Sequence, residues 1–145
     1  MTRLIKWILP LVVAAVASPA VGAMEPEDTV ENIVVKGSDF ERYLREAQSG
    51  NDESMRRVAV CYQYGAGVGK DYDNMLTWYG KAAKSGNVEA QYDLGMLYLS
   101  GIGVRQSDED AAYWFRKAAR NGSTKAMVCI GRQFAEGKGV LRDMR

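Results

Sequence analysis

The chain has 145 residues, a formal net charge of +1 and no histidine. This length fits a single domain, and the near-neutral charge lacks the basic excess that is typical of proteins binding nucleic acid or anionic membranes. The absence of histidine excludes Ser-His-Asp and Cys-His nucleophile activation, histidine-ligated metals and switching by imidazole protonation. The composition therefore excludes most hydrolase mechanisms.

The first 23 residues predict a removable export signal. Arg3 and Lys6 precede an apolar stretch that begins at Trp7, and the small residues ending at Ala23 form a cleavage pattern. Cleavage would leave Met24 first and change the net charge to −1. An uncleaved membrane anchor is the alternative, but the uncharged stretch has only 17 residues and contains prolines, whereas a span needs about 20. We expect a periplasmic or secreted protein.

Residues 24–37 predict a linker rather than part of a folded core. The segment begins with four acidic residues, Glu25, Glu27, Asp28 and Glu31, and then becomes apolar at residues 33–35. We expect the acidic part to be solvated and the apolar triplet to cap the first helix of the domain that follows. A short strand offered to a partner is the alternative.

From about residue 39 onward the sequence repeats with a period of 36 residues. Trp78 returns as Trp114, and each is followed at the same spacing by Lys-Ala-Ala. Pairs of glycines recur at the same interval, beginning at Gly65, Gly101 and Gly137. A period of this length predicts stacked supersecondary units that share one continuous apolar core.

Each repeat contains two kinds of predicted helix, which we call A and B. In residues 89–100, an A helix, apolar residues three and four apart are followed by Gly101, a typical C-terminal residue. Residues 108–120, a B helix, begin with acidic and end with basic residues, which suits the helix dipole. By the period, A helices are expected near 53–64, 89–100 and 125–136, and B helices near 39–49, 72–84 and 108–120.

The run A-Q-Y-D-L-G-M-L-Y-L-S-G-I-G-V from Ala90, together with W-F-R-K-A-A from Trp114, resembles the Sel1-like repeat, a relative of the tetratricopeptide repeat. The resemblance covers about residues 39–145 and implies an all-α fold, an α-solenoid of antiparallel helix pairs in a right-handed superhelix. We divide the repeat domain, 38–145, into a half repeat 38–50, repeats 51–86 and 87–122, and a partial repeat 123–145.

The partial repeat has room for an A helix only, because a third B helix would follow Val140. We therefore expect the last A helix to expose the face that such a B helix would cover. Polar residues such as Arg132 and Gln133 would make that face soluble, or another protein would cover it.

Several conspicuous residues are interpreted as architecture. Cys61 and Cys129 lie two repeats apart, too far for an internal disulfide if helices pack about 8–10 Å apart. We expect Cys61 to fill the core, with an intermolecular bridge or a redox role for Cys129 as the alternative. The G-x-G segments follow helices and are interpreted as turns rather than phosphate loops. Acidic residues at B-helix starts are interpreted as caps rather than metal ligands, so we predict no metal, cofactor or catalytic residue.

The positions that the repeat leaves variable are the candidate partner-binding residues. By analogy with tetratricopeptide arrays, A-helix residues line a concave groove, which an acidic peptide or helix with apolar anchors would fit. Packing of Tyr92 and Leu99 against a neighbouring helix is the alternative. The three predicted stripes are Glu53, Arg56, Val60 and Gln63; Glu89, Tyr92, Met96 and Leu99; and Lys125, Val128 and Arg132, with Ala135 beside them.

The leading functional hypothesis is an exported protein-protein interaction module, an adaptor, regulator or inhibitor without catalytic chemistry. The resemblance implies such roles, often in the bacterial envelope, and it leaves homo-oligomerisation through the unfinished C-terminal repeat open. One alternative is a β-lactam-binding or β-lactam-hydrolysing enzyme of the cysteine-rich Sel1-like kind, although those carry a cysteine pair in each repeat and this sequence does not. The other alternative is an immunity protein that blocks a toxin.

Overall fold

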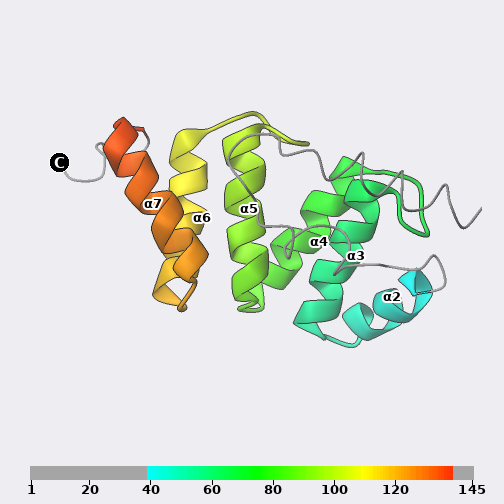
Figure 1. The fold of residues 1–145 in the computed structure, drawn as a ribbon. Helices are drawn as coiled ribbons and strands as arrows, with labels where there is room; N and C mark the ends of the chain where they lie inside the picture. The colour runs from blue at the N-terminus through cyan, green and yellow to red at the C-terminus, as the bar shows by residue number, and fades with distance from the viewer. Residues whose placement is uncertain (1–38, 139–145) are drawn as a thin grey trace, which may run out of the picture. The chain divides into compact units, whose positions relative to one another are not determined.

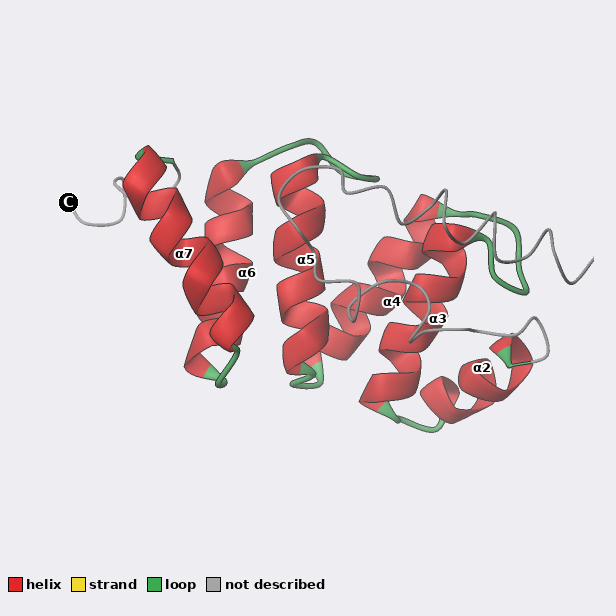
Figure 2. Cartoon of the chain, in the orientation of Figure 1, coloured by secondary structure: helices red, strands yellow, loops and turns green. Residues whose placement is uncertain are grey.

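The computed structural model describes residues 39–138, which form six α-helices and no strand (Figures 1 and 2). The helices are α2 (Phe40–Gln48), α3 (Asp52–Tyr64), α4 (Tyr72–Lys84), α5 (Val88–Ser100), α6 (Asp108–Arg120) and α7 (Thr124–Glu136). The all-α prediction is confirmed, and each helix begins and ends within one residue of the predicted bounds. The predicted export signal and linker lie outside the described residues.

The A helices α3, α5 and α7 begin at the same kind of cap. The side chains of Asn51, Asn87 and Ser123, each just before its helix, accept a hydrogen bond from the backbone N–H three residues later. This bond satisfies one of the donors that a helix N-terminus otherwise leaves unpaired. Two B helices have the equivalent cap. Asp71, just before α4, is the cap of that helix, as predicted, whereas α6 is capped by Ser107 and its acidic residues lie in the first turn.

The A helices also end alike, because each is followed by a glycine in the left-handed region. Gly65, Gly101 and Gly137 have φ values of 70°, 70° and 65°. A residue with a Cβ adopts this conformation only at a cost, so the recurring glycine ends the helix and starts the turn to the next B helix. The turn interpretation of the G-x-G segments is consistent with this geometry.

The apolar interior is built between consecutive helices, each of which packs against the next. One buried cluster joins α2 and α3 through Phe40, Tyr43 and Val58, and Trp78 of α4 packs against it. A second cluster centres on Phe115 of α6 and includes residues of α5 and α7. Tyr43 and Phe115 stand two periods apart, so equivalent residues supply buried contacts in both clusters, as the period predicts.

Helices α5 and α6 approach each other closely at Gly95. A Cβ built on Gly95 of α5 would lie 2.5 Å from two ring carbons of Phe115, which is itself fully buried in α6. The absence of a side chain at residue 95 is therefore what admits the aromatic ring.

No helix in the described part of the chain is long and apolar enough to cross a membrane.

Candidate partner-binding surface

The predicted binding residues lie on the three A helices, as the repeat requires. Their side chains are not equally available, and neighbouring helices already use several of them. We call the predicted residues together the A-helix surface. Of these residues, α3 carries Glu53, Arg56, Val60 and Gln63, α5 carries Glu89, Tyr92, Met96 and Leu99, and α7 carries Lys125, Val128 and Arg132.

On α3, Arg56 forms an ion pair with Asp93 of α5. The Arg56 Nε atom lies 2.6 Å from Asp93 Oδ2, and both side chains are only 17% exposed. Burial raises the pKa of the Asp93 carboxyl, and the Arg56 guanidinium partly opposes that rise. Burial acts to lower the pKa of Arg56, but the charge of Asp93 and the hydrogen bond to it raise that pKa overall. The pair therefore holds the guanidinium charged and fixed between two repeats.

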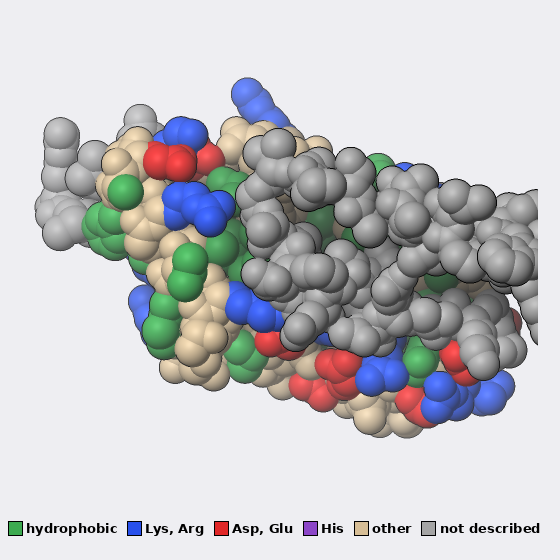
Figure 3. All heavy atoms as spheres, viewed as in Figure 1, with side chains coloured by type: hydrophobic (Ala, Val, Ile, Leu, Met, Phe, Trp, Pro, Cys, Tyr) green, Lys and Arg blue, Asp and Glu red, His purple; other side chains and the backbone are tan. Residues whose placement is uncertain are grey.

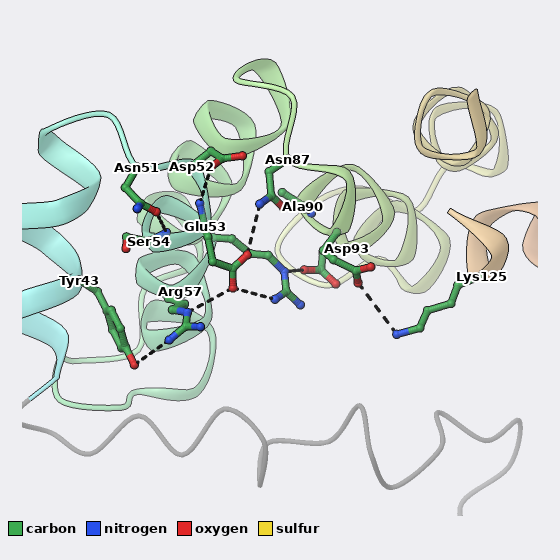
Figure 4. A network of polar contacts seen from close by, with 12 residues as sticks. Tyr43, Asn51, Asp52, Glu53, Ser54, Arg57, Asn87, Ala90, Asp93 and Lys125 are labelled. Carbon is green, nitrogen blue, oxygen red and sulfur yellow. Dashed lines mark hydrogen bonds and ion pairs between the residues drawn. The ribbon is translucent and has the colours of Figure 1, made fainter. Parts of the chain in front are cut away.

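Glu53 connects the same region to further helices, as Figure 4 shows. Its carboxylate accepts a hydrogen bond from Arg57 Nε at 3.2 Å and another from Asn87 Nδ2, next to α5, at 3.3 Å. Arg57 also donates to the hydroxyl of Tyr43 on α2 at 3.2 Å. This chain of contacts runs from α2 through α3 to the start of α5, so the charged groups of α3 are held by structure rather than free to reorient.

Two other α3 residues, Val60 and Gln63, are buried or bonded within the fold. Val60 is only 4% exposed, and a buried side chain offers no surface to a partner, so its prediction as a binding residue is wrong. Gln63 is partly buried and accepts a hydrogen bond from the hydroxyl of Tyr79 at 2.9 Å. Its side chain therefore links α3 to α4.

The apolar middle of the A-helix surface packs mainly against its neighbours. Tyr92, Met96 and Leu99 are partly buried against the cluster around Phe115. The rings of Tyr92 and Phe115 lie 5.9 Å apart at a tilt of 44°. Tyr92 and Leu99 thus pack against a neighbouring helix, which was the alternative to a role in binding. All three residues are only partly buried, so some of their apolar surface stays accessible.

On α7 the predicted residues are more accessible. Lys125 Nζ lies 4.0 Å from Glu89 Oε2 and 5.9 Å from the centre of the Tyr92 ring, so it connects α7 to α5. Val128 is 64% exposed, and Arg132 is exposed as well. In the view of Figure 3, apolar side chains are visible over α7 at the left, and acidic and basic side chains lie next to one another along the lower edge of the molecule.

Asp93 is the residue that sequence reasoning missed. It lies 37 residues after Arg56, one more than the period, so the two residues occupy different positions of the repeat and share no motif. The signal that could have revealed the pair is the complementary charge of Arg56 and Asp93 on successive A helices. The same signal relates Glu89 to Lys125, which are one period apart.

Nothing in residues 39–138 groups three or more acidic or cysteine side chains where they could hold a metal ion. Cys61 and Cys129 are both free thiols, as expected from their separation of two repeats. Trp78 and Trp114 have lysine ammonium groups over their rings, Lys81 at 4.4 Å and Lys117 at 5.4 Å. These lysines come from the basic ends of the same helices, so the aromatic and basic positions of the motif support one another.

Antiparallel helix pairs, capped and ended alike, define a helical-repeat protein, and comparison with known families specifies which kind. The Sel1 repeat family model matches residues 52–87 and 88–123, which coincide with the two full repeats of helices α3–α4 and α5–α6. The chain is a member of the Sel1-repeat family.

Two solved structures support the assignment. The chain is similar to a protective antigen present in uropathogenic Escherichia coli strains that displays an SLR fold, with 33% identity, a TM-score of 0.68, and coverage of 70% of this chain and 22% of that one. It is also similar to a Sel1 repeat protein from Oxalobacter formigenes, with 30% identity, a TM-score of 0.66, and coverage of 72% and 43%. The chain thus spans less than half the length of either structure. No curated protein matches it.

Proposed function

We propose that this protein is an exported protein-protein interaction module that binds a partner on its A-helix surface or on the exposed face of its last helix. Sel1-repeat proteins generally mediate protein-protein interaction and are typically non-catalytic scaffolds. The roles of adaptor, regulator or inhibitor all require the same thing, a rigid surface that another protein can recognise.

The observation that carries the proposal is the cross-helix network on the A-helix surface. Arg56 of α3 pairs with Glu53 on the same helix and with Asp93 of α5, and Glu89 of α5 pairs with Lys125 of α7. Side chains that are already ordered lose little conformational freedom on binding, which favours affinity. Beside them, exposed Val128 and Arg132 provide an apolar and a cationic contact. This combination suits a partner segment with apolar anchors and an acidic group.

Charge reversal at Arg132 tests the surface. Arg132 is exposed, so Arg132→Glu should leave the fold intact while weakening capture of an acidic partner from an envelope extract at least about tenfold. The matched control is Arg105→Glu, which makes the same change at an exposed residue of the loop between α5 and α6. Tyr92→Ala is a second variant. Because Tyr92 also packs on Phe115, the stability of this variant has to be measured alongside its capture of the partner. Equal capture by Arg132→Glu and Arg105→Glu would exclude this surface.

Export is proposed from the pattern of the first 23 residues. If the signal is cleaved after Ala23, protein recovered from a bacterial host should lie in the periplasm or the medium and begin at Met24. Cell fractionation followed by N-terminal sequencing makes this measurement. Full-length protein in the membrane fraction would support an anchor instead.

The β-lactamase alternative has weaker support. The cysteine pair that marks such relatives is absent from each repeat, and both cysteines of this chain are free. A colorimetric β-lactam assay on the purified protein should therefore show no turnover above that of a buffer control. The immunity-protein alternative belongs to the binding class and predicts that the captured partner is a toxin.

A further inference from the structure

One stripe of α7 is exposed along its whole length. Met127, Val128 and Phe134 are 50%, 64% and 45% exposed, and Gly131 and Ala135 between and beside them are exposed as well. These five residues recur every three to four positions, so they share one side of the helix. We call this set the open α7 face. It is apolar throughout, which is unusual for a surface helix.

The repeat shows what normally covers such a face. The equivalent residues of α5, one period earlier, are Gln91, Tyr92, Gly95, Tyr98 and Leu99, and none of them is exposed. The B helix α6 supplies much of their cover, because Phe115 contacts Tyr92 and closes over Gly95. The open α7 face therefore has the surface that binds a B helix within the repeat, but no helix of residues 39–138 occupies it.

The surroundings of Gly131 and of its equivalent in α5, Gly95, show the difference between the two helices most directly. A Cβ on Gly95 would meet the Phe115 ring at 2.5 Å, whereas a Cβ on Gly131 would meet nothing within 4 Å. In α5, the aromatic ring of Phe115 from the next helix occupies the space that a side chain at residue 95 would take. In α7, no described residue occupies the corresponding space at Gly131.

We propose that the open α7 face binds, in trans, an amphipathic helix of a partner protein that resembles a B helix. Its key residue is a large aromatic side chain that sits on Gly131, as Phe115 sits on Gly95. Small residues should flank the aromatic on the same side, as Ala111 and Ala118 do in α6, where both are fully buried. The inference rests on the proposed function as an interaction module and specifies the chemistry of one partner.

The chain's own B-type end matches this chemistry only in part. Tyr43 of α2 stands at the position equivalent to Phe115, but it is already buried in the cluster between α2 and α3. Asp39 and Glu46 stand where α6 has Ala111 and Ala118, and Arg42 stands where it has Trp114. Arg42 pairs with Asp39, and Glu46 accepts a hydrogen bond from the hydroxyl of Ser54. Burying these charged groups against an apolar face would cost more than an alanine there. A head-to-tail contact with α2 of a second copy is therefore disfavoured relative to a partner helix.

The probe is a fluorescent peptide with the sequence of residues 107–121, which contains α6. Added to the full chain, it should bind saturably by fluorescence anisotropy. Replacing the phenylalanine of the peptide by alanine should weaken binding at least about tenfold, as loss of a central aromatic anchor does. Gly131→Leu in the protein should weaken it to the same degree because the new side chain fills the gap.

The matched control is Gly80→Leu on α4, where a Cβ would also meet nothing within 4 Å. This variant makes the same change away from the open α7 face and should bind the peptide as the wild type does. Circular dichroism of both variants confirms that they are folded. Absence of saturable binding, or equal binding by Gly131→Leu and wild type, would overturn the inference.

Two other occupants are distinguishable. If the wild type forms a dimer that Gly131→Leu dissociates and the peptide does not bind, a second copy covers the face and the inference is wrong. If the peptide binds only after residues 1–38 or 139–145 are removed, the chain covers its own face and the inference is also wrong. Loss of partner capture in Arg132→Glu with normal peptide binding would concern the A-helix surface alone, so the two proposals can fail separately.

Discussion

Gly95 and Gly131 are equivalent residues with opposite surroundings. A methyl group added at residue 95 would lie 2.5 Å from two carbons of the Phe115 ring, which is fully buried. Adding it at residue 131 meets no atom within 4 Å. The environment of the position, rather than the glycine itself, should therefore decide the effect of a substitution.

We predict that Gly95→Ala lowers the free energy of unfolding by about 1–3 kcal/mol, the usual effect of overpacking. Gly131→Ala should instead raise it by up to about 1 kcal/mol, because alanine is the better helix former. Urea denaturation of the two variants and the wild type makes the comparison. Equal effects at both positions would contradict the close approach of α5 and α6.

Cys61 is fully buried, and burial raises the pKa of its thiol to about 11. Only the thiolate reacts with disulfide reagents, so Cys61 should stay unlabelled at pH 7 to 8 in the folded protein. Cys129 is partly buried, and its pKa is also raised by burial, so it should react slowly but before Cys61. Mass spectrometry after timed exposure to a thiol reagent gives the order.

The pH dependence has a definite sign. Because the folded-state pKa of Cys61 lies above the ordinary thiol pKa of 9.0, which applies to the unfolded chain, the neutral thiol favours the folded state. Its contribution is complete below pH 9.0 and is lost as the pH rises towards 11. Cys61→Ala should therefore flatten the loss of stability over this range. Rapid labelling of Cys61 at pH 7 would contradict its buried position.

At the scale of the helix, the Arg56–Asp93 ion pair links two A helices that are not consecutive in the chain. Replacing Arg56 by methionine leaves the buried Asp93 carboxylate without its cation, and we expect a loss of about 3–5 kcal/mol at neutral pH. The double variant Arg56→Met, Asp93→Leu should recover much of that loss, because no buried charge remains. Thermal denaturation of the three proteins gives the values.

The loss in Arg56→Met should shrink on acidification. Burial raises the folded-state pKa of Asp93, so the protonated carboxyl favours the folded state, and this contribution is lost as the pH rises through the folded-state pKa. Arg57→Met is the control. Its ion pair with Glu53 is 42% exposed on both sides and should be worth less than about 1 kcal/mol. Its hydrogen bond to Tyr43 adds about 1 kcal/mol, so the total loss should stay below that of Arg56→Met. Equal losses from Arg56→Met and Arg57→Met would contradict the structural role of the buried pair.

The helices themselves were predictable because their ends carry local signals. Cap residues such as Asn87 and left-handed glycines such as Gly101 recur with the period and act within one turn of the chain. The surface was less predictable, because exposure depends on contacts between repeats. Val60 occupies a variable position yet is buried, and the partner of Arg56 is one residue out of register with the repeat. Such offsets arise from how helices cross, which the period alone does not specify.

At the scale of the whole described domain, stability is expected to be a sum of contacts between neighbouring helices. Each helix from α2 to α7 packs against the next, as Figure 1 shows for α5, α6 and α7. In such arrays a helix covered on one side opens more readily than one covered on both. Helix α7, with its open face, is covered on one side only, whereas α4 and α5 are covered on both sides.

Amide hydrogen exchange of the full chain, followed by mass spectrometry, tests this nearest-neighbour arrangement most directly. We expect peptides from α4 and α5 to exchange most slowly and those from α7 to exchange fastest among the A helices, with α7 becoming protected when the α6 peptide is added. Equal protection of all six helices, or stronger protection of α7 than of α5 in the free protein, would contradict it.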